Sequence, residues 1–330
     1  MRLSIVSTLY ASEPYVEEFC RRVAASASQI TAEFEIILVN DGSPDGAREV
    51  ALDVRRRNPH VKVIDLARNF GHHKAMMTGL AHARGELVFL IDSDLEESPE
   101  LLLEFAGEME RARADVVFGV QEKRRGQWFE RWTGTLYYKL FNAITSQPIP
   151  RNLLTVRLMT QRYVRALVAH QEREINIGAL WAFTGFDQVP LPVDKPRKGT
   201  TTYNVRRKIA HMVNSITSFS SSPLVFIFYL GVSISVLSAV FGTYLIIRRL
   251  FFGVLMEGWP SLIVSVWFLG GLTLLCIGII GVYLAKVFTE VKQRPYTVIR
   301  EVFEAGVNDL DAAGHAPRRW DAGAPARSTH

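Results

Sequence analysis

Short apolar runs alternate with segments of helical periodicity over residues 1–120. The apolar runs have the length of buried strands and lie at Leu3–Thr8, Glu35–Asn40, Val61–Leu66, Glu86–Ile91 and Val116–Val120. Helical segments lie at Pro14–Ser26 and Lys74–Ala83, and a third follows Ser98, which we expect to cap it with Pro99 at the first helical position. Strands that alternate with helices predict an α/β fold with a mostly parallel sheet.

Two long segments in the last third of the chain carry no charged residue. They are Pro223–Ile247, with 25 residues, and Gly258–Ala285, with 28 residues. A helix needs about 20 apolar residues to cross the hydrocarbon core of a membrane. We therefore expect transmembrane helices within residues 223–250 and 258–286. A pair of buried core helices is the alternative, but soluble cores rarely need two such segments in series.

The charges around these segments predict how the chain is oriented. Lys and Arg are more frequent in the two flanks than in the connection, which favours cytosolic flanks at the inner (plasma) membrane. Residues 1–202 then form a cytosolic domain, and residues 287–330 form a cytosolic tail that we expect to be mobile after about residue 303. Small residues in both spans allow close helix packing, either within one chain or between copies in a homo-oligomer.

Residues 203–222 join the cytosolic domain to the first span. Their apolar residues recur at helical spacing, and a basic cluster lies at one end. This pattern predicts an amphipathic helix on the membrane surface. An amphipathic helix packed on its own domain remains an open alternative.

Composition excludes several classes of protein. With 48% hydrophobic and 22% charged residues, the chain is neither wholly disordered nor collagen-like. Its two cysteines, Cys20 and Cys276, exclude a disulfide framework. The net charge is +5 and no basic tract is interleaved with aromatic residues, so we expect no nucleic-acid partner.

Polar clusters follow three of the expected strands. They are the turn at residues 41–46, the segment Arg68–Gly71 and the sequence Asp92-Ser93-Asp94. Ligands of parallel α/β sheets bind at the carboxyl ends of the strands, where these clusters fall. Two carboxylates one residue apart can hold Mg²⁺ or Mn²⁺ together with substrate phosphates. A solvated acidic loop is the alternative, but the position directly after a buried strand favours the metal.

These motifs together resemble the family 2 glycosyltransferases with the GT-A fold, and most closely the polyprenyl-phosphate sugar synthases of the dolichyl-phosphate mannose synthase and GtrB type. The resemblance covers about residues 3–300. It is carried by Val39-Asn40-Asp41-Gly42-Ser43, Arg68-Asn69-Phe70-Gly71, Asp92-Ser93-Asp94-Leu95, Arg157-Leu158-Met159 and the closing Glu290, Lys292, Arg294, Pro295 and Tyr296.

The resemblance implies a role for each matching position. The nucleotide-sugar donor is expected to contact Thr8, Tyr10, Asp41, Arg68, Gly71, Asp92, Arg197 and Lys198. The metal, Mg²⁺ or Mn²⁺, is expected on Asp94, Asp92 and Glu96, with Asp94 as the firmest ligand. The acceptor phosphate is expected on Arg124, Arg131 and Thr135, and the groups implied in catalysis are Asp92, Asp94 and Arg131. For His72 and His73 we expect loop packing or a nucleotide contact rather than metal binding.

The chain departs from the family pattern at four places. Thr8-Leu9-Tyr10-Ala11-Ser12 replaces the usual Pro-x-Tyr-Asn-Glu, Glu96 replaces a glutamine, Gln121 replaces an arginine, and Thr155 replaces an aspartate sometimes proposed as a base. A phosphate acceptor is already an anion near neutral pH, so it needs no base, whereas a hydroxyl acceptor usually does.

We therefore expect an inverting, metal-dependent glycosyltransferase that moves one sugar from a nucleotide sugar to a polyprenyl phosphate at the membrane, for cell-envelope glycans. The alternatives are a glycosyltransferase that uses another lipid or glycan acceptor, and a GT-A scaffold without activity. The retained Asp41, Asp92 and Asp94 favour an enzyme over the scaffold.

Overall fold

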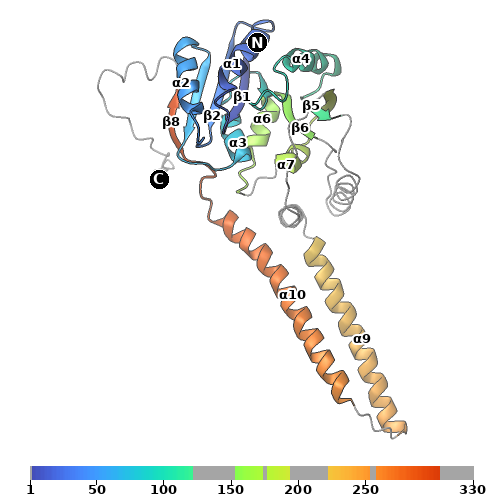
Figure 1. Cartoon of the computed structure of the whole chain (residues 1–330). Helices are drawn as coiled ribbons and strands as arrows, with labels where there is room; N and C mark the ends of the chain where they lie inside the picture. The colour runs from blue at the N-terminus through green and yellow to red at the C-terminus, as the bar shows by residue number, and fades with distance from the viewer. Residues whose placement is uncertain (1, 122–152, 174–176, 194–221, 253–257, 305–330) are drawn as a thin grey trace, which may run out of the picture.

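The computed structural model describes residues 2–121, 153–173, 177–193, 222–252 and 258–304 (Figure 1). Its centre is a sheet of eight strands in the order β7-β5-β6-β4-β1-β2-β3-β8. The strands are β1 Leu3–Leu9, β2 Phe34–Asn40, β3 Val61–Leu66, β4 Leu87–Leu90, β5 Val116–Gln121, β6 Leu153–Thr160, β7 Gln188–Val193 and β8 Ile299–Phe303. The helices are α1 Val16–Ser28, α2 Ala47–Arg57, α3 His72–His82, α4 Leu101–Ala112, α6 Gln161–Ala169, α7 Ile177–Phe183, α9 Ser222–Phe252 and α10 Trp259–Val291.

The predicted α/β class is confirmed, and the sheet is a mixed, Rossmann-like one. Strands β4, β1, β2 and β3 are parallel neighbours, as the alternation of strands and helices predicts. Strand β6 runs antiparallel to both β4 and β5, and β8 runs antiparallel to β3. Both antiparallel strands come from beyond the first 120 residues, where the sequence pattern predicted no strand.

Alternate side chains of the central strands point to opposite faces of the sheet and pack in two hydrophobic cores. Ile5, Ile36 and Phe89 pack with α1, α2 and α4 on one face of the sheet. Val6 and Ile37 pack with α3, α6 and α7 on the other face. The central strands are apolar at nearly every position because helices cover both faces.

The helix after Asp94 begins later than its sequence predicts. The structure starts α4 at Leu101, with Glu100 at the cap position, and no side chain caps it. Ser98 is therefore not the cap that we expected. Its hydroxyl instead donates to the Glu100 carboxylate and accepts from the Arg22 guanidinium, which ties α4 to α1.

The two long helices leave the sheet domain from one end, as Figure 1 shows: α9 runs away from the domain and α10 returns toward it. Among the described residues, one helical segment, Ser265–Val291, is long and apolar enough to cross a membrane. The apolar part of α9, Leu224–Ser238, is shorter. The structure thus supports one of the two expected spans by length and composition. The helix expected within residues 203–222 lies outside the described residues, apart from Ser222, where α9 begins.

The segment after α10 rejoins the sheet, which the expectation of a tail from residue 287 did not include. Strand β8 pairs with β3, and Ile299 lies opposite Leu66, the last residue of β3. The polypeptide that leaves α10 therefore enters the domain at the carboxyl ends of the parallel strands.

Candidate functional site

The loops that follow β2 and β3 are joined through one buried carboxylate. Asp41 follows β2 directly and is 2% exposed. One of its oxygens accepts from the Phe70 amide at 2.7 Å, and the other accepts from the Gly71 amide at 3.0 Å. Burial raises the pKa of Asp41 above its ordinary value of 3.8, although the two amides oppose this shift. The two segments that the resemblance assigned to the nucleotide thus form one unit.

Gly42 allows the loop after β2 to lie close to the loop after β3. Its φ of 58° lies in the left-handed region, and a Cβ atom there would come within 2.5 Å of the Asn69 amide nitrogen. A side chain would therefore be strained and would also push the Arg68–Asn69 backbone away. Arg68 is exposed, and its guanidinium carbon lies 4.4 Å from the centre of the Phe70 ring, which keeps a cation at the rim of the loop.

His72 connects the ends of β1 and β4. Its Nδ1 is 2.9 Å from the Thr8 hydroxyl, and its Nε2 is 3.4 Å from Asp92 Oδ1. Burial lowers the pKa of His72 below its ordinary value of 6.5, against the opposing influence of Asp41 and Asp94. A neutral imidazole can donate to only one of these two partners at a time. Of the two expectations for His72, packing within the loops fits its contacts.

The sequence Asp92-Ser93-Asp94 forms a tight turn at the end of β4. Ser93 is buried, and its hydroxyl donates to the Thr8 carbonyl at 2.9 Å. Asp94 Oδ1 accepts from the Glu96 amide at 3.0 Å, and Leu95 between them has a φ of 60°. These contacts fix the backbone of the turn and leave Asp92, Asp94 and Glu96 partly exposed beside one another in sequence.

The donor set of this turn fits a divalent cation that also binds substrate. Within the described part of the chain, no three His, Cys, Asp or Glu side chains form a metal-binding group. Mg²⁺ in nucleotide sites is usually held by one or two carboxylates together with substrate phosphates. Asp92 and Asp94 supply two such carboxylates. The predicted metal ligands, including Glu96, stay predictions.

A buried cation lies next to this turn on β6. Arg157 pairs in register with Leu90, two residues before Asp92, and is fully buried. Its guanidinium lies 3.0 Å from the centre of the Trp181 ring, and burial lowers the pKa of Arg157 to about 9. Thr155 lies two residues earlier on the same strand. It is partly exposed and stands at the end of the sheet that carries the turn.

The structure brings together Thr8, Asp41, Gly71, Asp92 and Asp94, and it leaves Tyr10, which is 54% exposed, at the rim. Arg68 and Glu96 lie in the loops after β3 and β4, and the remaining predicted contacts fall outside the described residues. They are Arg124, Arg131, Thr135, Arg197 and Lys198. Their roles in binding the acceptor phosphate and the donor diphosphate stay predictions.

Two side chains that support the site were only partly foreseen: the sequence pointed to His72 but not to its partners, and it did not point to Asp65. His72 is 64 residues from Thr8 in the chain, so no local pattern shows their contact. Asp65, the last residue but one of β3, is fully buried, and its carboxylate accepts from Asn40 Nδ2 at 2.7 Å. The signal available in the sequence was a carboxylate between two apolar residues of a strand, Ile64 and Leu66, because a buried charge usually needs a buried partner.

Comparison with known proteins assigns the class and the family of this site. The family model "Glycosyl transferase family 2" matches residues 4–168. A glycosyltransferase of Mycobacterium tuberculosis (strain CDC 1551 / Oshkosh) is 56% identical over 92% of this chain and 89% of its own length. The SfII prophage-derived bactoprenol glucosyl transferase of Shigella flexneri is 31% identical over 91% of this chain and 98% of its own. The chain belongs to glycosyl transferase family 2, and it is a glycosyltransferase.

The solved structures that resemble the chain are more distant. The mannosyltransferase PcManGT from Pyrobaculum calidifontis, solved with GDP-Man and Mn²⁺, is 17% identical and covers 66% of this chain and 63% of its own, with a TM-score of 0.45. A likeness at this level carries no argument about activity.

Proposed function

We propose that this glycosyltransferase moves one sugar from a nucleotide-sugar donor to a polyprenyl phosphate at a membrane surface, with Mg²⁺ or Mn²⁺ at Asp92 and Asp94. Relatives named bactoprenol glucosyl transferase match over nearly their full length, which supports a polyprenyl acceptor. The expected GT-A architecture agrees with the mixed sheet and with the family match.

One structural observation carries the proposal: the candidate site and α10 meet at the same edge of the sheet. Seven residues, 292–298, separate the end of α10 from β8, and the Val298 carbonyl accepts from the Ala67 amide at 2.9 Å. Ala67 directly precedes Arg68. A polyprenyl chain is insoluble in water, so its phosphate must be met at the bilayer surface. The contact between the segment after α10 and Ala67, at the base of the donor loops (residues 41–46 and 68–71), supports a donor site near that surface.

We assign a multi-pass arrangement, and the excess of Lys and Arg in the flanks of the two long helices favours a cytosolic catalytic domain. Helix α10 contains one segment that can span a membrane, and we assign α9, which runs in the opposite direction, as the second span. The last turn of α10 is tied to the domain because Glu290 Oε1 accepts from the Arg173 amide at 2.8 Å. This assignment brings the site edge to the cytosolic face of the inner membrane.

The chemistry requires neutralisation of a departing diphosphate. A divalent cation held by Asp92 and Asp94 would supply positive charge to the donor phosphates. His72 and Thr8 orient Asp92, and Ser93 fixes the turn that carries both carboxylates. Arg197 and Lys198 are assigned to the diphosphate as well, where preorganised cations stabilise developing negative charge.

The acceptor is assigned to a second set of cations. Arg124, Arg131 and Thr135 hold its phosphate, which attacks the anomeric carbon from the face opposite to the leaving diphosphate and inverts the configuration. The attacking group is an anion, so no proton has to be removed. Thr155, in the place of the family aspartate, is compatible with this reaction because no base is needed at that position.

The proposal is tested by incubating the purified full-length chain with polyprenyl phosphate and a panel of labelled nucleotide sugars, with Mg²⁺, with Mn²⁺ or with EDTA. We expect labelled lipid from one donor, only when a divalent cation is present. Label in a different lipid or glycan would identify another acceptor. Absence of both transfer and nucleotide binding would contradict an enzyme and favour a scaffold.

A further inference from the structure

An arginine of β8, the strand that follows α10, forms hydrogen bonds at the base of the donor loops. Arg300 lies on β8, and its Nη1 is 3.1 Å from Asp65 Oδ2. Its Nη2 donates to the Ala67 carbonyl at 2.7 Å. A single guanidinium thus binds both Asp65, near the end of β3, and Ala67, the first residue after this strand.

Asp65 also binds a residue of the neighbouring strand β2. Its Oδ1 accepts from Asn40 Nδ2 at 2.7 Å, and Arg48 Nε lies 3.2 Å from Oδ2. Asp65 is fully buried, so its charge depends on these donors for compensation. Asn40 in turn uses its Oδ1 to accept from the Ser43 amide at 3.2 Å. The chain of contacts therefore runs from Arg300 through Asp65 to the turn that carries Asp41.

The two ends of this chain of contacts meet again at Asp41. Asn40 precedes Asp41 in sequence, and Ala67 precedes the loop whose Phe70 and Gly71 amides bind the Asp41 carboxylate. Arg300 consequently touches, directly or through Asp65, the bases of both loops that form this unit. A shift of Arg300 would change the spacing between these two loops.

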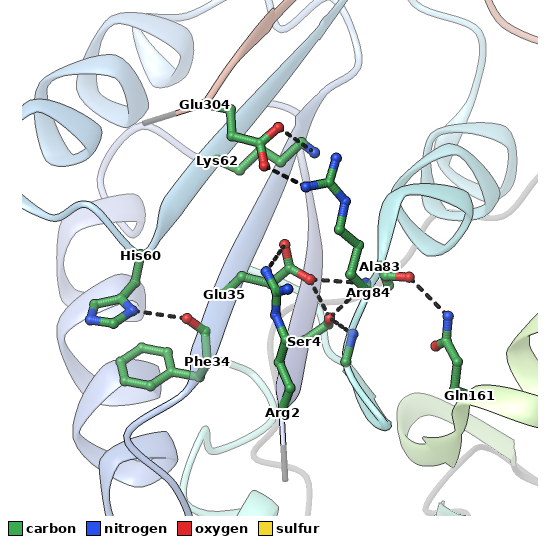
Figure 2. A network of polar contacts seen from close by, with 11 residues as sticks. Arg2, Ser4, Phe34, Glu35, His60, Lys62, Ala83, Arg84, Gln161 and Glu304 are labelled. Carbon is green, nitrogen blue, oxygen red and sulfur yellow. Dashed lines mark hydrogen bonds and ion pairs between the residues drawn. The ribbon is translucent and has the colours of Figure 1, made fainter. Parts of the chain in front are cut away.

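Strand β8 is also anchored at its other end, far from the site. Figure 2 shows Glu304 between Lys62 and Arg84, at distances of 3.1 Å and 3.0 Å. The Glu304 carbonyl accepts from Arg55 Nη2 at 2.9 Å. These contacts lie at the amino end of the parallel strands, next to Arg2, Ser4 and Glu35. The two anchors hold the same strand but at opposite edges of the sheet, so their effects can be separated.

We propose that Arg300 is a positioning residue for the donor site: by binding Asp65 and Ala67 it sets the spacing of the two loops that Asp41 joins. The inference rests on the proposed function for the identity of the donor. On this inference β8, the strand that follows α10, supports the donor site from outside. A domain that ends before α9 lacks this strand and is expected to bind nucleotides more weakly.

The test compares four variants of the full-length chain in detergent: Arg300→Ala, Arg300→Lys, Glu304→Ala and Glu301→Ala. Glu301 is an exposed residue of the same strand and serves as the control. Glu304→Ala loosens β8 at the edge away from the site. Arg300→Lys keeps a positive charge near Asp65 but cannot make both contacts, so it should give an intermediate result.

The first measurement is amide hydrogen exchange at Phe70, Gly71 and Ser43, which needs no ligand. We expect Arg300→Ala to raise the exchange rates at these amides by about tenfold or more, because it removes hydrogen bonds to a buried charge. Glu304→Ala should lower the melting temperature and leave these three amides protected. Equal protection in Arg300→Ala and the wild-type chain would overturn the inference, and so would equal loss of protection in the Arg300→Ala and Glu304→Ala variants.

The second measurement is the affinity for UDP and GDP with Mg²⁺ or Mn²⁺. We expect about tenfold weaker binding of the preferred nucleotide by Arg300→Ala, and unchanged binding by Glu301→Ala. A failure of the wild-type chain to bind any nucleotide would contradict the proposed function, and the exchange rates would still decide whether Arg300 orders the loops. Unchanged affinity in Arg300→Ala, with a wild-type chain that binds, would contradict the inference alone.

Discussion

Polar side chains gather at both ends of the parallel strands, but they are bonded differently at the two ends. At the amino end, Glu35 and Lys62 are almost fully buried and bind other protein groups, including Ser4 and Glu304. At the carboxyl end, the side chains of Asp92 and His72 are 26% and 45% exposed. The side chains at the amino end bind only protein groups in these contacts and stabilise the fold, whereas those at the carboxyl end keep polar atoms available to a ligand.

This difference separates the polar residues that stabilise the fold from those that can bind a cation or a substrate. Buried polar groups satisfied within the protein stabilise the fold when both partners are present. Carboxylates that are oriented by neighbours and still reach solvent can bind a cation or a substrate. Asp41 combines both features: it is buried at the carboxyl end, and its oxygens hold the loop that the donor is assigned to. Substitutions at the two edges should therefore affect different measurements.

Among three variants at residues that support the two edges, the largest effect is expected at Asp41. In Asp41→Asn an amide group replaces one acceptor oxygen, so either the Phe70 or the Gly71 amide loses its acceptor. Leaving a buried donor without an acceptor costs about 1–3 kcal/mol, and a cost in this range lowers kcat/KM by roughly 10–100-fold. Initial rates at varied donor concentration measure it, with Asp53→Asn on the surface of α2 as the control. Equal kcat/KM in the two variants would contradict the role given to Asp41.

A different response is expected at the amino edge from Glu35→Ala. Glu35 Oε1 accepts from the Ser4 hydroxyl at 2.6 Å and from the Arg84 amide at 2.9 Å. Its loss should lower the free energy of unfolding by about 1–3 kcal/mol and leave kcat/KM of the folded protein unchanged. Thermal denaturation and initial rates on the same preparation separate the two quantities. A fall in kcat/KM without a fall in melting temperature would contradict a purely stabilising role for Glu35.

The smallest of the three effects is expected from His72→Ala. The variant removes the side chain that links Thr8 to Asp92, so Asp92 becomes less well oriented. Side chains that orient metal ligands typically contribute about 10–100-fold to metal affinity or activity, and we expect the lower end of that range. Nucleotide affinity at a series of Mn²⁺ concentrations measures the effect. His73→Ala, at the exposed neighbour, is the control, and equal behaviour of the two variants would remove the role assigned to His72.

Much of the fold follows from local sequence pattern. The five strands expected in the first 120 residues are present, and no strand start or end differs from its expected position by more than one residue. The position of Asp92 and Asp94 at the end of β4 also agrees with the prediction, because strand ends can be read from where an apolar run stops. The carboxyl-edge location of Asp41 and the loop at Arg68–Gly71 agrees for the same reason.

The rest of the arrangement depends on contacts between distant segments. Pairing of β8 with β3 joins residues more than 230 positions apart, and neither strand's composition specifies its partner. The contact of His72 with Asp92 joins the first residue of α3 to the turn after β4, so it depends on how this helix packs on the sheet. Arg300 looks like an ordinary surface charge in the sequence, and only the register of β8 brings it to the buried Asp65.

The most direct test of the account is the rate of sugar transfer to polyprenyl phosphate by Asp94→Ala, compared with Glu104→Ala on the exposed face of α4. Both variants lose one carboxylate, so the total charge changes equally. We expect Asp94→Ala to abolish the metal-dependent transfer and Glu104→Ala to retain it. Equal rates in Asp94→Ala and the wild-type chain would contradict the role of Asp94 as a metal ligand.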